Sequence, residues 1–252
     1  METAEPLFTH DGAVWRSSAE TGGPFGGLHG GAVAGLVVAE MEREARERGL
    51  GVMLSAVVLF LRPAPKGPLT TRTTLLRKGG RAGALETELI AEEKLVAKGV
   101  ASCVAPRPVE DAPAAPPRAS DPAAMPPWRL LPRFTHPTLF DVLDFRIADD
   151  GTKWGRLLRP LVPYPTTLAP AFAVADNGQP LSLLGRRAIP PYAFPNIDLA
   201  LHLSRAPQGA WIGVAARSDW RPDGMGLTEA ALSDAWGPLG RACQTIVLMP
   251  NS

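Results

Sequence analysis

An internal repeat narrows the choice of fold for this chain of 252 residues. Residues 59–69 read LFLRPAPKGPL, and residues 201–211 read LHLSRAPQGAW. A shift of 142 positions places Pro65-Lys66-Gly67 on Pro207-Gln208-Gly209 and brings VASCV near ACQTI without a gap. An ungapped match of this length predicts that one supersecondary unit occurs twice.

A segment rich in Pro and Ala separates the two units. Residues 105–127 read APRPVEDAPAAPPRASDPAAMPP and have no apolar periodicity, which is typical of an extended connector. We therefore expect an N-terminal repeat over residues 1–104, a linker over 105–127 and a C-terminal repeat over 128–252.

Each unit is expected to contain one helix. In the first unit the helix covers about residues 31–48, and Gly49 is a natural stop. Its N-terminal half, GAVAGLVVA, is apolar on every side and is therefore expected to be buried. In the second unit a shorter helix covers about residues 166–175, capped by Thr166 or Thr167 and stopped by the turn sequence Asp176-Asn177-Gly178.

Runs rich in β-branched residues and separated by turn signals follow each helix. In the first unit they are MLSAVVLFLR, LTTRTTLLRK, GALETELIAEE and LVAKGVASCVA. In the second unit they are FPNIDLALHLSR, WIGVAARSDW, MGLTEAALSD and GRACQTIVLM, with LFDVLDFRI and WGRLLRP ahead of the helix. We expect an α+β fold of two helices, each wrapped by an antiparallel sheet, with the two sheets joined edge to edge.

The composition argues against several classes of protein. A net charge of +1 and a pI near 7.9 do not suit a nucleic-acid-binding surface. The sequence contains neither a basic leader nor an apolar run of the roughly 18 residues needed to cross a bilayer, so we expect a soluble cytoplasmic protein. Its histidines lack metal-binding spacing, so we expect no metal site, and Cys103 and Cys243 are expected to be reduced core residues.

A glycine-rich stretch leads into the first helix. Residues 22–33 read GGPFGGLHGGAV, and they match neither a P-loop nor the Gly-x-Gly-x-x-Gly pattern of dinucleotide sites. No Lys lies between Gly22 and Gly49 to reach a phosphate. Backbone N–H groups at such a helix N-terminus can instead contact a polarised carbonyl oxygen.

With these features the sequence resembles the double hot-dog acyl-CoA thioesterases, including the medium-chain thioesterase II type. The resemblance rests on the repeated helix-and-sheet unit, Phe-Leu-Arg-Pro at residues 60–63, an Asp after the second helix, Asn-Ile-Asp at residues 196–198 and a Gln on the last strand. It covers nearly the whole chain outside the linker. It implies hydrolysis of an acyl-CoA thioester by an activated water, with no cofactor beyond the coenzyme A of the substrate.

The resemblance implies a catalytic trio in the second repeat, formed by Asp176, Asn196 and Gln244. Asn196 stands where a Thr is also found in the family, and this changes the geometry of the hydrogen bond. Asp176 can act as a base, whereas the two amides can orient a water or stabilise charge without ionising. The proposed oxyanion and substrate contacts are Gly27, His29, Gly30, Gly31, Arg62 and Arg205. His29 equally suits a role at the helix entry.

Comparison of the repeats predicts one competent site per chain. The 142-residue shift places Gln244 on Ser102 and Asn196 on Leu54, while matching the helices places Glu40 opposite Asp176. The first repeat is therefore expected to carry a degenerate site.

Two other functions remain open at this stage. A hot-dog hydratase or dehydratase uses an Asp with a nearby His, and a non-catalytic acyl-CoA binding protein keeps the tunnel without water activation. For either function the partner is a small acyl-CoA molecule, with no nucleic acid and no membrane. Pairing of wrapped sheets favours a homo-oligomer, a dimer or larger.

Overall fold

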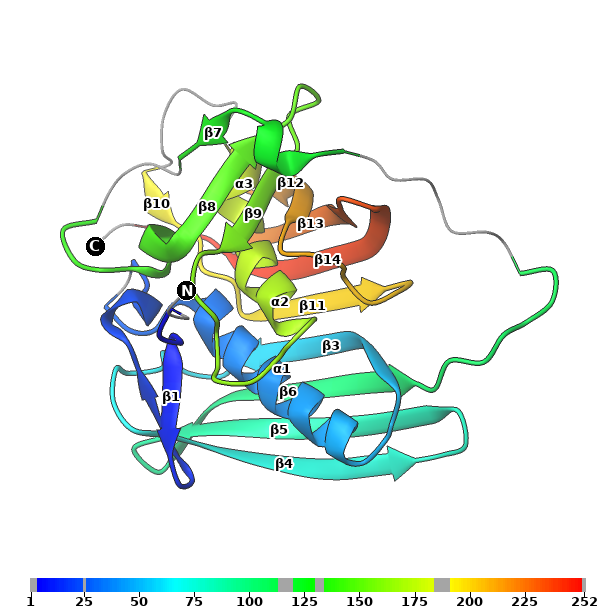
Figure 1. Ribbon diagram of the computed structural model, residues 1–252. Coiled ribbons are helices and arrows are strands. Elements are labelled where there is room, and N and C mark those ends of the chain that lie inside the picture. Colours follow the sequence, from blue (N-terminus) through cyan, green and yellow to red (C-terminus); the bar gives the residue numbers. More distant parts are fainter. Residues whose placement is uncertain (1–3, 25, 113–119, 130–133, 184–190, 251–252) are drawn as a thin grey trace.

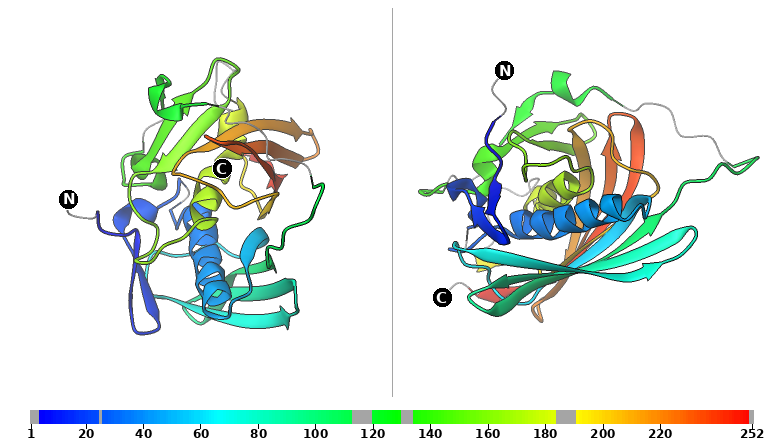
Figure 2. Two further views of the ribbon diagram at one scale, coloured as in Figure 1. Left: turned by 45° about the vertical axis from the view of Figure 1, so that its right-hand side comes forward. Right: turned by 60° about the horizontal axis from the view of Figure 1, so that its bottom comes forward.

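The computed structural model describes residues 4–24, 26–112, 120–129, 134–183 and 191–250. A 13-stranded antiparallel sheet curls around two packed helices, one from each repeat (Figure 1). Figure 2 shows the longer helix lying along the concave face of the sheet. Within the predicted linker, residues 113–119 lie outside the described residues. No helix among the described residues is long and apolar enough to cross a membrane.

The first repeat is built around helix α1, Gly30–Glu47. Its apolar residues are buried as expected, and Gly49 ends it with a positive φ of 63° while the Leu50 N–H donates to the Ala45 carbonyl. The other elements of this repeat are β1 (Phe8–Asp11), β2 (Val14–Ser17), η1 (Ala19–Thr21), β3 (Val52–Phe60), β4 (Leu69–Lys78), β5 (Ala82–Ala91) and β6 (Lys94–Val104).

The second repeat has two short helices in place of one long one, α2 (Ala169–Ala175) and α3 (Gly178–Leu183). Its strands and 3-10 turns are η2 (Pro122–Ala124), β7 (Pro127–Trp128), η3 (Leu139–Val142), β8 (Leu143–Ile147), β9 (Lys153–Leu157), β10 (Tyr192–Ala193), β11 (Asp198–Leu203), β12 (Ile212–Trp220), β13 (Met225–Asp234), β14 (Gly237–Val247) and β15 (Met249–Pro250).

The two sheets join edge to edge, as the sequence predicts. The strand order is β1-β2-β4-β5-β6-β3-β11-β14-β13-β12-β9-β8-β7, and β3 pairs with β11 from Leu59↔Asp198 to Ser55↔His202. Outward from this junction the two halves have matching orders, β3-β6-β5-β4 and β11-β14-β13-β12. The repeat is therefore a duplicated unit with an approximate twofold arrangement.

The structure corrects the register of the repeat by one residue in the strands. Strands β5 and β13 begin at Ala82 and Met225, and β6 and β14 begin at Lys94 and Gly237, which is a shift of 143 in both cases. A one-residue error exchanges the two faces of a strand, because side chains alternate. The shift of 142 holds only in the Pro-x-Gly turns. Ala101 and Met53 are therefore the counterparts of Gln244 and Asn196, rather than Ser102 and Leu54.

Five local predictions were incomplete or wrong. The N-terminal hairpin β1–β2 was not predicted, although its turn contains Asp11-Gly12. Helix α2 begins at Ala169, later than expected, and α3 begins at Gly178, where a turn was expected. Neither Thr166 nor Thr167 caps α2 with its side chain. Cys103 is a buried free thiol, but Cys243 is exposed.

Helices α1 and α2 pack with the start of one beside the end of the other. A Cβ added at Gly31 would lie 2.8 Å from the Ala173 carbonyl oxygen, and one added at Gly35 would lie 3.5 Å from the Ala169 carbonyl oxygen. Glycine at these positions lets the two backbones approach closely. The C-terminal end of α2 is therefore held against the N-terminus of α1.

Candidate active site

The structure brings together Asp176, Asn196 and Gln244 from three separate elements. Asp176 ends α2, Asn196 lies just before β11 and forms a bridge with Ile246, and Gln244 lies on β14. The Asn196 Nδ2 donates to Asp176 Oδ1 at 2.8 Å. The Gln244 Nε2 donates to the Asp176 carbonyl oxygen at 3.2 Å and lies 3.5 Å from Oδ1. The two carboxamides thus contact one carboxylate.

This cluster is largely shielded from solvent. Asp176 is 4% exposed and Gln244 is 1% exposed. The side-chain oxygen of Gln244 is buried and has no hydrogen-bond partner among the described residues. A buried amide oxygen without a donor costs roughly 1–3 kcal/mol, so this oxygen is suited to accept a hydrogen bond from a water or a ligand. It is a free acceptor beside the carboxylate.

The glycine-rich segment that leads into α1 packs against the Asp176 carboxylate. A Cβ added at Gly30 would lie 2.8 Å from Asp176 Oδ2 and 3.2 Å from Oδ1, so only glycine leaves room for the carboxylate there. The N–H of Gly30 has no hydrogen-bond partner among the described residues. The positive end of the α1 dipole also favours a negative charge at this place.

His29 completes the contact between the repeats. It is the N-cap of α1, and its Nδ1 accepts a hydrogen bond from the Gly31 N–H at 3.0 Å. The same Nδ1 lies 3.2 Å from Asp176 Oδ2. The ring packs edge-on against Phe140 with centroids 5.1 Å apart. His29 therefore has both the helix-entry role and a direct contact with the carboxylate.

Three hydroxyl groups behind Gln244 were not found from the sequence. Thr228 lies directly opposite Gln244 in the β13–β14 ladder, and its Oγ1 is 2.7 Å from the Ser218 Oγ. Ser218 in turn contacts Ser182 of α3 at 2.6 Å. Once the register is known, strand alternation places Thr228 on the buried face with Gln244. These hydroxyls connect α3 to the strands that carry the site.

Glu42 of the first repeat has a position similar to that of Asp176, whereas the sequence matched Asp176 with Glu40. As Asp176 lies at the N-terminus of α1, so Glu42 lies at the N-terminus of α2. Its carboxylate accepts hydrogen bonds of 2.8–3.0 Å from the N–H groups of Thr167, Leu168 and Ala169. These three donors occupy the Glu42 carboxylate, and Met53 and Ala101 stand at the strand positions that Asn196 and Gln244 have in the second repeat. The Glu42 carboxylate thus serves as a helix cap.

Burial and Glu42 also affect the neighbouring thiol. Desolvation, and after it the negative charge of Glu42, raise the pKa of Cys103 to about 11. The thiol is therefore protonated at neutral pH and does not act as a nucleophile.

Glu40 has a separate, structural environment. It accepts hydrogen bonds from the Tyr164 hydroxyl at 2.7 Å, from the Thr71 hydroxyl at 2.7 Å and from the Arg43 Nε at 3.0 Å. Burial raises the pKa of Glu40, but the bonds from Arg43, Tyr164 and Thr71 outweigh it and hold the pKa below the usual glutamate value. Glu40 joins the two repeats through Tyr164 and is saturated with donors.

The remaining expected contacts lie apart from the carboxylate. A Cβ on Gly27 would meet the Ala64 carbonyl oxygen at 2.6 Å, so this glycine packs against the β3–β4 loop. Arg62 is exposed in the same loop and donates to the Leu95 carbonyl oxygen. Arg205 follows the far end of β11 and forms a two-point ion pair with the fully buried Asp234 at 2.6 and 2.7 Å. Both terminal nitrogens of its guanidinium donate to Asp234.

Two family descriptions match this chain. The one described as acyl-CoA thioesterase N-terminal domain matches residues 19–104, and the one described as acyl-CoA thioesterase C-terminal domain matches residues 109–248. The chain belongs to the acyl-CoA thioesterase family. No curated protein sequence gives a significant match.

Solved structures share the fold of this member of the acyl-CoA thioesterase family along its whole length. A candidate thioesterase from Novosphingobium aromaticivorans has a TM-score of 0.74 at 18% identity, covering 99% of this chain and 100% of the other. A protein of unknown function with a hot dog fold from Alicyclobacillus acidocaldarius has a TM-score of 0.71 at 17% identity, covering 97% and 96%.

An acyl-CoA thioesterase II from Mycobacterium marinum has a TM-score of 0.64 at 19% identity, covering 99% of this chain and 95% of that protein. At these identities the similarity establishes the double hot-dog fold. It agrees with the fold that the sequence predicts for this family member.

Proposed function

We propose that this protein hydrolyses acyl-CoA thioesters to the free acid and coenzyme A. The observation that carries the proposal is the convergence of Asn196 and Gln244 on the buried carboxylate of Asp176, beside the glycine-rich start of α1. A base, two neutral amides and an N–H group at a helix N-terminus are the groups that water attack on a thioester needs.

In the proposed reaction Asp176 accepts a proton from a water that the amides of Asn196 and Gln244 hold. The resulting hydroxide attacks the carbonyl carbon of the thioester, and the N–H of Gly30 faces the oxyanion that forms. Collapse of this intermediate breaks the C–S bond. Asp176 then returns its proton to the thiolate, so that the acid and the free thiol leave and the carboxylate is restored.

The test is release of free thiol from acyl-CoA substrates of graded chain length. We expect turnover by the parent and a loss of at least about 100-fold in kcat for Asp176→Asn and Gln244→Ala, because each change removes a group that acts in the transition state. Asp149→Asn, an exposed carboxylate at a distant turn, is the matched control. Binding of acyl-CoA without thiol release by the parent would favour an acyl-CoA binding protein.

One contact favours a second candidate, an enoyl-CoA hydratase or dehydratase. Such hot-dog enzymes use an Asp with a nearby His, and His29 Nδ1 lies 3.2 Å from Asp176 Oδ2. The absorbance of the conjugated enoyl thioester at the same enzyme concentration distinguishes the two reactions. Loss of this absorbance without thiol release would indicate hydration and would exclude the hydrolase as the main activity.

A further inference from the structure

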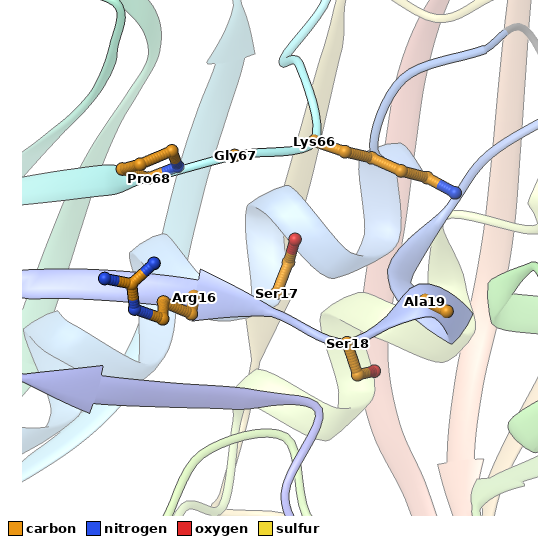
Figure 3. A pocket seen from close by; sticks show the side chains of 7 residues that line it. All are labelled: Arg16, Ser17, Ser18, Ala19, Lys66, Gly67 and Pro68. Atoms are coloured by element: carbon orange, nitrogen blue, oxygen red, sulfur yellow. The ribbon is translucent and has the colours of Figure 1, made fainter.

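A cavity of about 290 Å³ opens between the end of β2 and the loop that joins β3 to β4. Its lining residues are Arg16, Ser17, Ser18, Ala19, Lys66, Gly67 and Pro68 (Figure 3). The lining contains two cationic side chains, two hydroxyl groups and no carboxylate. In Figure 3 the Ser17 hydroxyl points into the gap between the two segments, with Arg16 and Lys66 at opposite ends.

The cavity exists because the strand ladder stops early. Strands β2 and β4 pair only at Val14↔Thr70 and Trp15↔Leu69. The next residue on the β4 side is Pro68, which has no N–H and so cannot extend the ladder. Beyond it the segments separate, and neither the Arg16 nor the Lys66 side chain makes an ion pair or hydrogen bond with another described residue.

The corresponding loop of the second repeat is closed. There the buried Asp234 accepts hydrogen bonds from the Gln208 N–H at 2.9 Å and from the Arg205 guanidinium. With the shift of 143, the counterpart of Asp234 in the first repeat is Ala91, which offers no acceptor. In the first repeat the loop therefore has no buried carboxylate at this position to pair with its cations.

The cavity and the carboxylate cluster both contact one glycine-rich segment. The Lys66 Nζ would be 2.7 Å from a Cβ placed on Gly22, so its ammonium lies against the start of this segment. The two ends of the segment meet, because the His29 N–H donates to the Thr21 carbonyl at 2.8 Å, and His29 contacts Asp176. The segment therefore links the cavity directly to the carboxylate.

We propose that this cavity binds the phosphate groups of the coenzyme A portion of the substrate. The inference rests on the proposed hydrolysis of acyl-CoA, and it assigns the phosphate contacts to Arg16, Ser17 and Lys66 rather than to Arg62 or Arg205. Two unpaired cations with a hydroxyl between them suit an elongated, multiply charged anion. The uncharged pantetheine arm then connects the cavity to Asp176.

The test compares acyl-CoA with the same acyl group on N-acetylcysteamine, which carries the thioester but no phosphate. We expect Lys66→Gln and Arg16→Gln each to raise KM for acyl-CoA about fivefold to tenfold with kcat unchanged, because each loses a charge-assisted contact. Neither variant should change kcat/KM for the N-acetylcysteamine thioester. The control is Arg81→Gln, an exposed cation at the other end of the β4–β5 hairpin.

Acyl-dephospho-CoA identifies which phosphate is bound. If the effect of a variant disappears with this substrate, the contact is to the phosphate on the ribose; if it persists, the contact is to the diphosphate. Either result supports the cavity as the site. As a readout without turnover, adenosine 3′,5′-bisphosphate should bind Asp176→Asn by calorimetry, and Lys66→Gln in that background should weaken binding.

The two proposals fail in different ways. A parent that hydrolyses neither thioester contradicts the proposed function. A parent that hydrolyses both, with KM for acyl-CoA unchanged in Lys66→Gln, Arg16→Gln and the double variant, overturns the assignment of the cavity and leaves the hydrolase intact.

Discussion

His29 Nδ1 lies 3.2 Å from Asp176 Oδ2 across the boundary between the two repeats, and it also accepts the Gly31 N–H. His29 therefore both caps α1 and contacts the carboxylate of the second repeat.

We predict that this contact contributes to catalysis beyond capping of the helix. His29→Ala removes the cap and the imidazole, whereas His29→Asn supplies an oxygen that can accept the helix N–H and so retains the cap. We expect both variants to lower kcat about 10- to 100-fold, since both lose the ring beside Asp176. The measurement is kcat for thiol release from acyl-CoA. Full activity in His29→Asn would show that His29 serves only as a cap.

Gly30→Ala tests whether the position of the carboxylate matters. The new methyl group would lie 2.8 Å from Asp176 Oδ2 and must displace it. We expect kcat to fall about 100-fold, because the displaced carboxylate no longer has the geometry that the proposed reaction needs. Gly80→Ala, where a Cβ meets nothing within 4 Å, is the control. A parental kcat in Gly30→Ala contradicts the proposed role of the Asp176 carboxylate.

Strand and helix patterns in the sequence predicted most elements of the fold. They did not predict the contacts of the polar clusters. The β4 and β13 runs were predicted with their observed bounds, because β-branched alternation and turn signals are local. The start of α2, which is later than predicted, was missed because its cap comes from Glu42, 125–127 residues away in the sequence. The trio came from family resemblance, whereas Thr228, the His29–Asp176 contact and the open cavity depend on strand register and on packing between the repeats.

Glu42→Ala should destabilise the protein through α2. The change leaves three N–H groups at the start of this helix without their acceptor, and we expect a loss of about 1–2 kcal/mol in the free energy of unfolding. Glu47→Ala on the same helix removes an exposed pair with Arg43 and should cost no more than about 0.5 kcal/mol. Urea unfolding measures both values. Equal effects would show that the cap contributes nothing specific.

From the environment of Asp234 we predict that part of the free energy of unfolding depends on pH. Burial raises its pKa, but hydrogen bonds from Arg205 and from the Gln208 and Trp236 N–H groups outweigh this effect and hold the pKa below the usual aspartate value. The folded protein therefore binds this proton more weakly than the unfolded chain does. The stabilisation is complete above the unfolded pKa of about 4 and is lost as the pH falls through the lower folded pKa.

Asp234→Asn should accordingly lower the free energy of unfolding by about 2–3 kcal/mol at neutral pH, because the buried Arg205 contact loses its charge. The difference between parent and variant should shrink as the pH falls below about 4, since the parent carboxyl then becomes neutral as well. Urea unfolding at several pH values measures this difference, with Asp149→Asn as the exposed control. A difference that stays constant down to acid pH would mean that the ion pair does not stabilise the fold.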